Sequence, residues 1–156
     1  MADVRPAAPE ADRLKLMALD EEDLAILSAH VQDAVLKVGD ITWLPKERRI
    51  VLAVNRFAWE VTAGKRRRSE HQRRRSALRF DRVSSVSSTG IDRGAGEKVL
   101  SLLALRFEPK QSPSGELLLD FSGGATMRLG VECLEVELTD LGPAWSTDHA
   151  PRHILG

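Results

Sequence analysis

The chain has 156 residues, of which 42% are hydrophobic and 29% charged, and its 23 basic side chains are matched by 23 acidic ones. A chain of this length normally forms one domain, or two small halves that share a core. No run of about 18 apolar residues is present, which excludes a membrane-spanning helix. The single cysteine, Cys133, excludes an internal disulfide framework.

The N-terminal segment, residues 1–12, is small, acidic and contains two prolines, which predicts a disordered leader. It lacks the basic and then apolar pattern of a signal peptide, so a cytoplasmic location is expected. We predict a single domain over residues 13–145 and a C-terminal tail over residues 146–156, where the periodic pattern does not continue.

One amphipathic helix is predicted near the N-terminus, at about residues 20–33. Asp20 is a suitable N-cap, and acidic residues in the first turn oppose the helix dipole. Leu24, Leu27 and Val31 follow at helical spacing and form one apolar stripe that would face a core.

Most of the remaining chain reads as strands, because short apolar or alternating runs are separated by turn residues. These runs cover residues 40–44 and 49–57, which form a predicted hairpin, and then residues 78–86, 99–107, 117–121 and 127–133. A loop is predicted around residues 90–96. Residues 132–141 fit either a strand or a helix, since their apolar positions change phase near Cys133, and the strand is slightly favoured.

The fold class that this pattern predicts is α+β, with one N-terminal amphipathic helix packed on a mainly antiparallel β-sheet. Residues 31–57 and 83–107 show a weak similarity, so two related halves are one option, although chance similarity between two hairpins explains it as well. A split or closed β-barrel is the alternative topology.

A basic block lies in the middle of the chain, where seven Lys or Arg residues fall within residues 65–75 and only Glu70 opposes them. We interpret the block as a strand-connecting loop. The candidate anion-binding or partner-binding residues are Arg66, Arg67, Arg68, Arg73, Arg74, Arg75 and Arg79. We expect the first half of the block to be mobile, and the second half, Arg73 to Arg75, to be held by the strand that follows.

Three interpretations of the basic block stay open. Arg forks match phosphate oxygens, so the block could bind nucleic acid, with an affinity that falls as salt is added. Against this stand the neutral net charge, the lack of a nucleic-acid-binding fold signature and the lack of aromatic residues inside the block. The block could instead bind an acidic protein, or be a solvated loop.

An acidic edge is predicted near the C-terminal end of the domain, at Glu132, Glu135, Glu137 and Asp140. Its simplest role is the solvent side of an amphipathic element. It could also be the counterpart of the arginines, either within the chain or between two copies of it.

The sequence supplies no residues for catalysis, a metal or a cofactor. His149 and His153 have helical spacing, but Pro151 between them disfavours the helix that a metal site would need. The serines at residues 84–88 lack the glycine pattern of a nucleophile elbow, and the glycines at 90–96 lack the spacing of a phosphate-binding loop.

Three stretches carry a resemblance to a known family: residues 14–24 (LKLMALDEEDL), residues 74–80 (RRSALRF) and residues 138–145 (LTDLGPAW). Together they resemble an alphaproteobacterial family catalogued as domain of unknown function 2948, from about Leu14 to Trp145. The resemblance implies a single-domain cytoplasmic bacterial protein. It implies no activity, cofactor or catalytic residue, and it places the basic block inside the domain.

The function that the sequence favours is therefore a non-catalytic binding or assembly module that uses its arginine-rich surface. The expected partner is an acidic protein surface or a second copy of the chain, and no membrane is involved. Nucleic acid is the rival partner. An enzyme with an unrecognised site is the rival class, and it would require a concave pocket with polar groups.

Overall fold

The computed structural model describes residues 13–62 and 65–143, and the side chains of residues 58–62, 65–72 and 143 lie outside this description. The predicted leader and tail also lie outside the described residues. Ten strands and one α-helix follow one another in the described ranges, with two short 3-10 helices. They are β1 (Lys15–Ala18), α2 (Glu21–His30), β2 (Ala34–Lys37), η1 (Val38–Asp40), β3 (Ile41–Leu44), β4 (Arg49–Thr62), β5 (Lys65–Phe80), β6 (Val83–Thr89), β7 (Val99–Pro109), β8 (Gly115–Phe121), η2 (Ser122–Gly124), β9 (Thr126–Val131) and β10 (Val136–Pro143).

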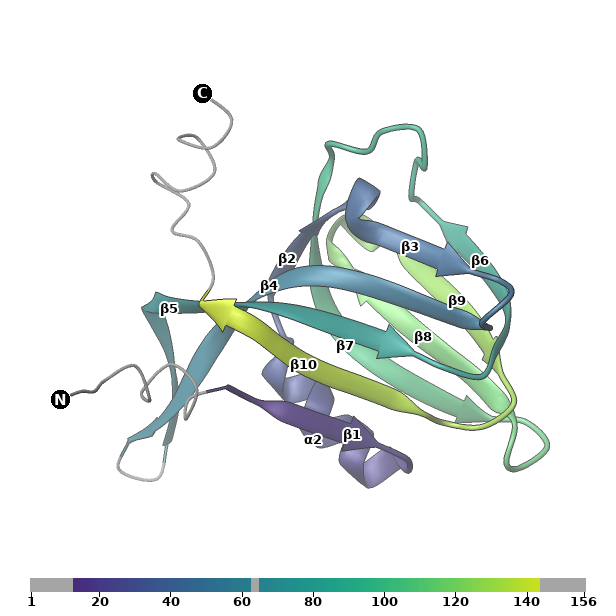
Figure 1. Ribbon diagram of the computed structural model, residues 1–156, viewed down its shortest axis with the longest axis horizontal. Helices are drawn as coiled ribbons and strands as arrows, with labels where there is room; N and C mark the ends of the chain where they lie inside the picture. The colour runs from purple at the N-terminus through teal and green to yellow at the C-terminus, as the bar shows by residue number, and fades with distance from the viewer. Residues whose placement is uncertain (1–12, 63–64, 144–156) are drawn as a thin grey trace, which may run out of the picture.

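The strands form one antiparallel sheet, in the order β1-β10-β5-β4-β2-β7-β8-β9-β6, with β3 paired to β4 beside this path. The sheet curves strongly around its own core (Figure 1). The two ends of the order, β1 and β6, do not pair with each other in the described ranges, so the sheet is not closed into a barrel. The predicted fold class is confirmed, and the closed-barrel alternative is wrong.

The N-terminal helix is confirmed as α2. The Asp20 carboxylate accepts a hydrogen bond from the Asp23 amide at 2.8 Å, which caps the first turn. Leu24 and Leu27 are buried, and the helix packs against β1, β4 and β7. The amide of Leu105 in β7 also donates to the Ser28 hydroxyl at 3.0 Å, which ties the helix to the sheet.

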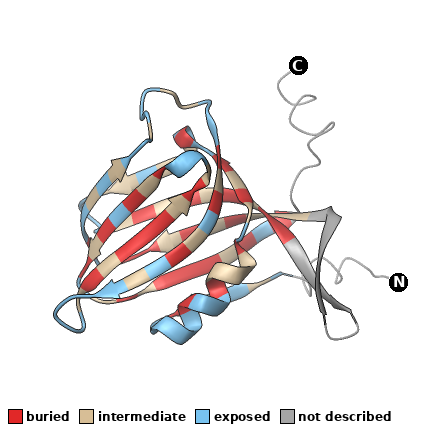
Figure 2. Ribbon diagram, turned by 180° about the vertical axis from the view of Figure 1, so that it is seen from behind, coloured by how far each residue is buried: buried red, intermediate tan, exposed pale blue. Residues whose placement is uncertain are grey.

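The core lies inside the curve of the sheet, and in several strands buried residues alternate with less buried ones (Figure 2). In β4, for example, Ile50, Leu52 and Val54 are buried while the residues between them are half-buried. Leu78 and Phe80 of β5 and Val136 and Leu138 of β10 continue the same inner layer beside β4.

Two points that the sequence left open are settled by the strand pairing. Residues 136–143 form strand β10, so the favoured strand is confirmed, and residues 132–135 form the turn that changes the phase of the apolar pattern. The option of two related halves is wrong. β3 and β4 pair as a hairpin, whereas the corresponding strands β6 and β7 lie in different parts of the sheet and do not pair.

Strands β4 and β5 extend beyond the rest of the sheet. β10 pairs with β5 only as far as Arg74, and β2 pairs with β4 at Asn55. Beyond these points the two strands pair only with each other, as far as Thr62 and Lys65. We call residues 56–62 and 65–73 the β4–β5 ribbon; it points away from the sheet in Figure 1.

The start of β8 shows how closely the strands pack. A Cβ atom at Gly115 would lie 2.5 Å from the Glu108 carbonyl oxygen and 2.6 Å from Phe107 Cζ. We expect Gly115→Ala to lower the free energy of unfolding by about 1–3 kcal/mol, because the β7–β8 pair must shift to admit the methyl group. Urea denaturation would measure the difference in unfolding free energy between the variant and the wild type.

Gly130→Ala in β9 is the matched control. Its Cβ would contact the Ser85 hydroxyl, which is on an exposed side chain that can rotate away. The control should therefore lose clearly less stability, and equal losses for the two variants would contradict the backbone clash at Gly115.

Candidate functional site

The basic block lies along a strand and does not form the predicted loop. Lys65 to Phe80 form β5, and each residue from Arg73 to Phe80 has a partner in β4. The block lacks apolar alternation because much of it belongs to the β4–β5 ribbon, which no other described strand covers. Arg66, Arg67 and Arg68 keep their register with β4, while their side chains lie outside the described residues.

The structure divides the second half of the block between two faces. Ser76, Leu78 and Phe80 point inward, so strand alternation places Arg74 on the inner side and Arg73 and Arg75 on the outer side.

The guanidinium of Arg73 lies over the ring of Phe57, with its central carbon 4.7 Å from the ring centroid. This is the geometry of a cation–π contact, which holds the side chain against the sheet. Phe57 itself is buried, at 8% exposure.

Arg75 has only long contacts. Its Nη1 donates to Asn55 Oδ1 at 3.4 Å, and its Nη2 lies 3.9 Å from an Asp40 carboxylate oxygen. Its side chain is 41% exposed, so much of its donor capacity faces solvent. We call Arg73, Arg75, Phe57 and Asn55 the outer arginine patch.

The aromatic neighbours of the basic block could not be recognised inside the block, because they belong to another strand. β4 places Phe57 opposite Arg73, and it places Trp59 at the register position opposite Arg68. The pairing of Trp59 with Arg68 lies three residue pairs from the Thr62–Lys65 pair, which is the last pair of the ribbon.

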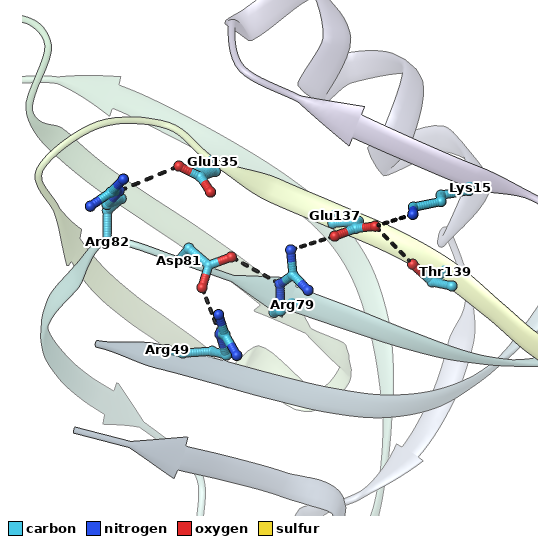
Figure 3. A network of polar contacts seen from close by, with 8 residues as sticks. All are labelled: Lys15, Arg49, Arg79, Asp81, Arg82, Glu135, Glu137 and Thr139. Atoms are coloured by element: carbon cyan, nitrogen blue, oxygen red, sulfur yellow. Dashed lines mark hydrogen bonds and ion pairs between the residues drawn. The ribbon is translucent and has the colours of Figure 1, made fainter. Parts of the chain in front are cut away.

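Arg79, the last of the predicted binding residues, is engaged within the chain. Its Nε donates to Asp81 at 2.9 Å, its Nη2 contacts Glu137, and Arg49 donates to the other oxygen of Asp81 at 2.6 Å (Figure 3). Glu137 also accepts from Thr139 and lies 3.5 Å from the Lys15 ammonium. Arg79 therefore belongs to a cross-strand network and is separate from the outer arginine patch.

The acidic edge is already paired with arginines of the same chain. The pairs are Glu132 with Arg48 at 2.5 Å, Glu135 with Arg82 at 3.4 Å, Asp140 with Arg56 at 2.7 Å, and Glu137 with Arg79. These contacts favour the reading in which the acids balance arginines within the chain. They weigh against docking of this edge onto the basic block of a second copy.

Asp140 differs from the other three acids, because it lies on the inner face in a buried polar cluster. Its carboxylate accepts two hydrogen bonds from Arg56, at 2.9 and 2.7 Å, one from the Ser76 hydroxyl at 2.7 Å and one from the Leu14 amide at 2.8 Å. Burial raises the pKa of Asp140, but the hydrogen bonds from Arg56, Ser76 and Leu14 lower it by more, so the pKa lies below its usual value.

This cluster has a structural role, because it links several strands through one carboxylate. It joins β4, β5, β10 and the residue before β1, and each carboxylate oxygen has two donors. The sequence contained a signal for it, because Arg56, Ser76 and Asp140 continue the buried phase of their three strands.

Other candidate sites receive no support from the described residues. Within them, no group of three or more His, Cys, Asp or Glu side chains is placed to hold a metal ion. His149 and His153 lie outside the described residues. With ten residues, the one α-helix of the described ranges is too short to span a bilayer.

Comparison with known proteins gives one match. Searches of curated proteins and of solved structures found nothing similar to the chain. A family model described as a protein of unknown function, DUF2948, matches residues 14–153 and so covers all the elements described above. The chain therefore belongs to the DUF2948 family.

Proposed function

We propose that the protein is a non-catalytic binding module that holds the phosphate backbone of nucleic acid on the β4–β5 ribbon and the outer arginine patch. The observation that carries the proposal is the register of β4 on β5. It places the basic block on a projecting two-stranded ribbon and sets an aromatic residue beside Arg73.

Charge is concentrated on this part of a neutral chain. Residues 58–75 contain seven basic and two acidic side chains. A two-stranded ribbon fits the major groove of DNA, and Arg forks bind phosphate oxygens in pairs. Neighbouring residues of one face lie about 6.7 Å apart along a strand, so Arg73 and Arg75 can contact separate phosphates.

Two observations favour nucleic acid over an acidic protein or a second copy. β4 sets Phe57 against the guanidinium of Arg73 and places Trp59 at the register position opposite Arg68, so the basic block has aromatic residues on the neighbouring strand. The acidic edge, which was the expected surface for self-association, is paired with arginines within the chain. We also propose a cytoplasmic location in an alphaproteobacterium, which the resemblance to the family implies.

The test compares Arg73→Gln/Arg75→Gln with a control that removes the same charge elsewhere. Arg106→Gln/Arg128→Gln is suitable, because both arginines are exposed and pair with carboxylates on β8. Binding to a duplex DNA and to a single-stranded RNA would be followed by fluorescence anisotropy between about 50 and 200 mM salt. The patch variant should bind about tenfold more weakly, and its salt slope should fall by about 1.4–1.8.

The outcomes separate the alternatives. Binding that is absent at the lowest salt, or that both variants weaken equally, would overturn the proposal. Equal affinity for polyglutamate of matched charge would identify an acidic protein as the partner instead.

A further inference from the structure

A small pocket opens between β3 and β6, where the curved sheet does not close. It includes Ile50 near the start of β4, at the opposite end of that strand from the ribbon. The start of β6 is joined to the turn between β3 and β4, where the Val83 amide donates to the Arg48 carbonyl at 2.9 Å. Beyond it, β3 pairs only with β4 and β6 only with β9 among the described strands, so each has a free edge. The pocket at this seam has a volume of about 170 Å³.

Apolar side chains make up most of its wall. Residues from both free strands and from the core behind them line it: Val38, Ile41, Trp43, Ile50, Val86, Ile91 and Met127. Ile41, Trp43, Val86 and Ile91 pack against the core but are only partly buried. The hydrophobic core therefore meets solvent at this seam, and a bound apolar group would gain the free energy of covering it.

One charged side chain, Arg93, also lines the pocket. It makes no ion pair or side-chain hydrogen bond with any other described residue. The loop that carries it is held in place. The Gly94 amide donates to Asp92 at 3.0 Å, and the Gly39 amide donates to the Gly96 carbonyl at 2.9 Å.

We propose that this pocket binds a small monocarboxylate with an apolar body, of the size of a medium-chain fatty acid or a simple aromatic acid. The apolar body lies against Trp43, Ile41 and Val86, and the carboxylate pairs with the fork of Arg93. One arginine matches one negative charge, and the volume is too small for a nucleotide. The inference is independent of the proposed binding of nucleic acid.

The experiment titrates the full-length protein with butyrate, hexanoate and octanoate, by isothermal calorimetry and by chemical-shift changes of the amides of β3, β6 and residues 91–96. Each added methylene should tighten binding about three- to fourfold until the pocket is full. Octanol, which lacks the charge, should bind about tenfold or more weakly than octanoate. Shift changes spread over the whole protein, or no saturable binding, would overturn the proposal.

Variants test the two halves of the site separately. Arg93→Gln should weaken octanoate binding about tenfold or more and leave octanol unchanged. Lys98→Gln, which removes a charge from the same loop outside the pocket lining, should change neither. Val86→Phe should fill the pocket and abolish binding of both. Equal octanoate affinity in Arg93→Gln and Lys98→Gln would contradict the role of Arg93. DNA binding should be the same in all three variants, because the pocket is separate from the ribbon.

Discussion

Replacing Asp140 by asparagine is expected to lower the free energy of unfolding by about 3–5 kcal/mol, because it leaves the Arg56 charge buried without a counter-charge. The Asp140 side chain is fully buried and that of Arg56 is 3% exposed, so water cannot replace the lost partner. Ser76→Ala removes one hydrogen bond from the same cluster and should cost about 1 kcal/mol. Urea denaturation followed by circular dichroism measures both.

The chain offers a matched control in a second Arg–Asp pair. Asp120 accepts two hydrogen bonds from Arg106, at 2.6 and 3.0 Å, but the arginine side chain is 51% exposed. Asp120→Asn should therefore cost less than about 1 kcal/mol, as exposed ion pairs do. If Asp140→Asn lowered the free energy of unfolding no more than this control, the buried cluster would not link the strands as described above.

The contribution of Asp140 should also depend on pH. The pKa of its carboxyl is lower in the folded protein than its ordinary value, so ionisation stabilises the fold. This contribution is complete above the pKa of the unfolded state, about 3.9, and is lost as the pH falls further, through the folded-state pKa. The difference in unfolding free energy between the wild type and Asp140→Asn should thus be constant near neutral pH and shrink below about pH 4.

Shortening the β4–β5 ribbon should abolish most nucleic-acid binding while the fold persists. Ala58 and Ser69 are directly opposite each other, so an Asn-Gly turn can replace residues 59–68. The change removes four basic and one acidic residue. We expect a loss of affinity on the order of a hundredfold, with a salt slope smaller by about three to four. Anisotropy with the same duplex DNA measures both quantities.

Stability is the control for this deletion. The removed residues pair only with each other among the described strands, so the free energy of unfolding should change by less than about 1 kcal/mol. A variant that keeps the ribbon but carries Arg66→Gln, Arg67→Gln and Arg68→Gln separates charge from shape. Unchanged binding in both variants would show that the ribbon is not the contact surface.

The sequence predicted those elements whose apolar pattern is strong. The stripe of Leu24, Leu27 and Val31 behind the Asp20 cap predicted the helix, and the apolar runs predicted most strands of the sheet. Strand order was beyond the sequence, because alternation says which face of a strand is buried but not which strand lies beside it.

The same limit explains what was missed at the candidate site. The basic block shows no alternation of apolar and polar residues, so nothing in its sequence pattern marked it as a strand. Its aromatic neighbours lie on β4, which only the pairing reveals. Asp140 was grouped with Glu137 as one acidic edge, whereas the phase of Val136 and Leu138 already placed it on the opposite face.

The place of β10 in the sheet has a consequence for the newly synthesised chain. β10 follows the other nine strands in the sequence, yet it lies between β1 and β5. β1 pairs with β10 alone among the described strands, so it has no strand partner until β10 has been synthesised. Arg56 precedes Asp140 by 84 residues, which at 5–20 residues per second is roughly 4–17 s of synthesis. During that interval β1 has no strand partner, and Arg56 has no carboxylate from Asp140. The rate of translation therefore sets how long these parts of the sheet stay incomplete.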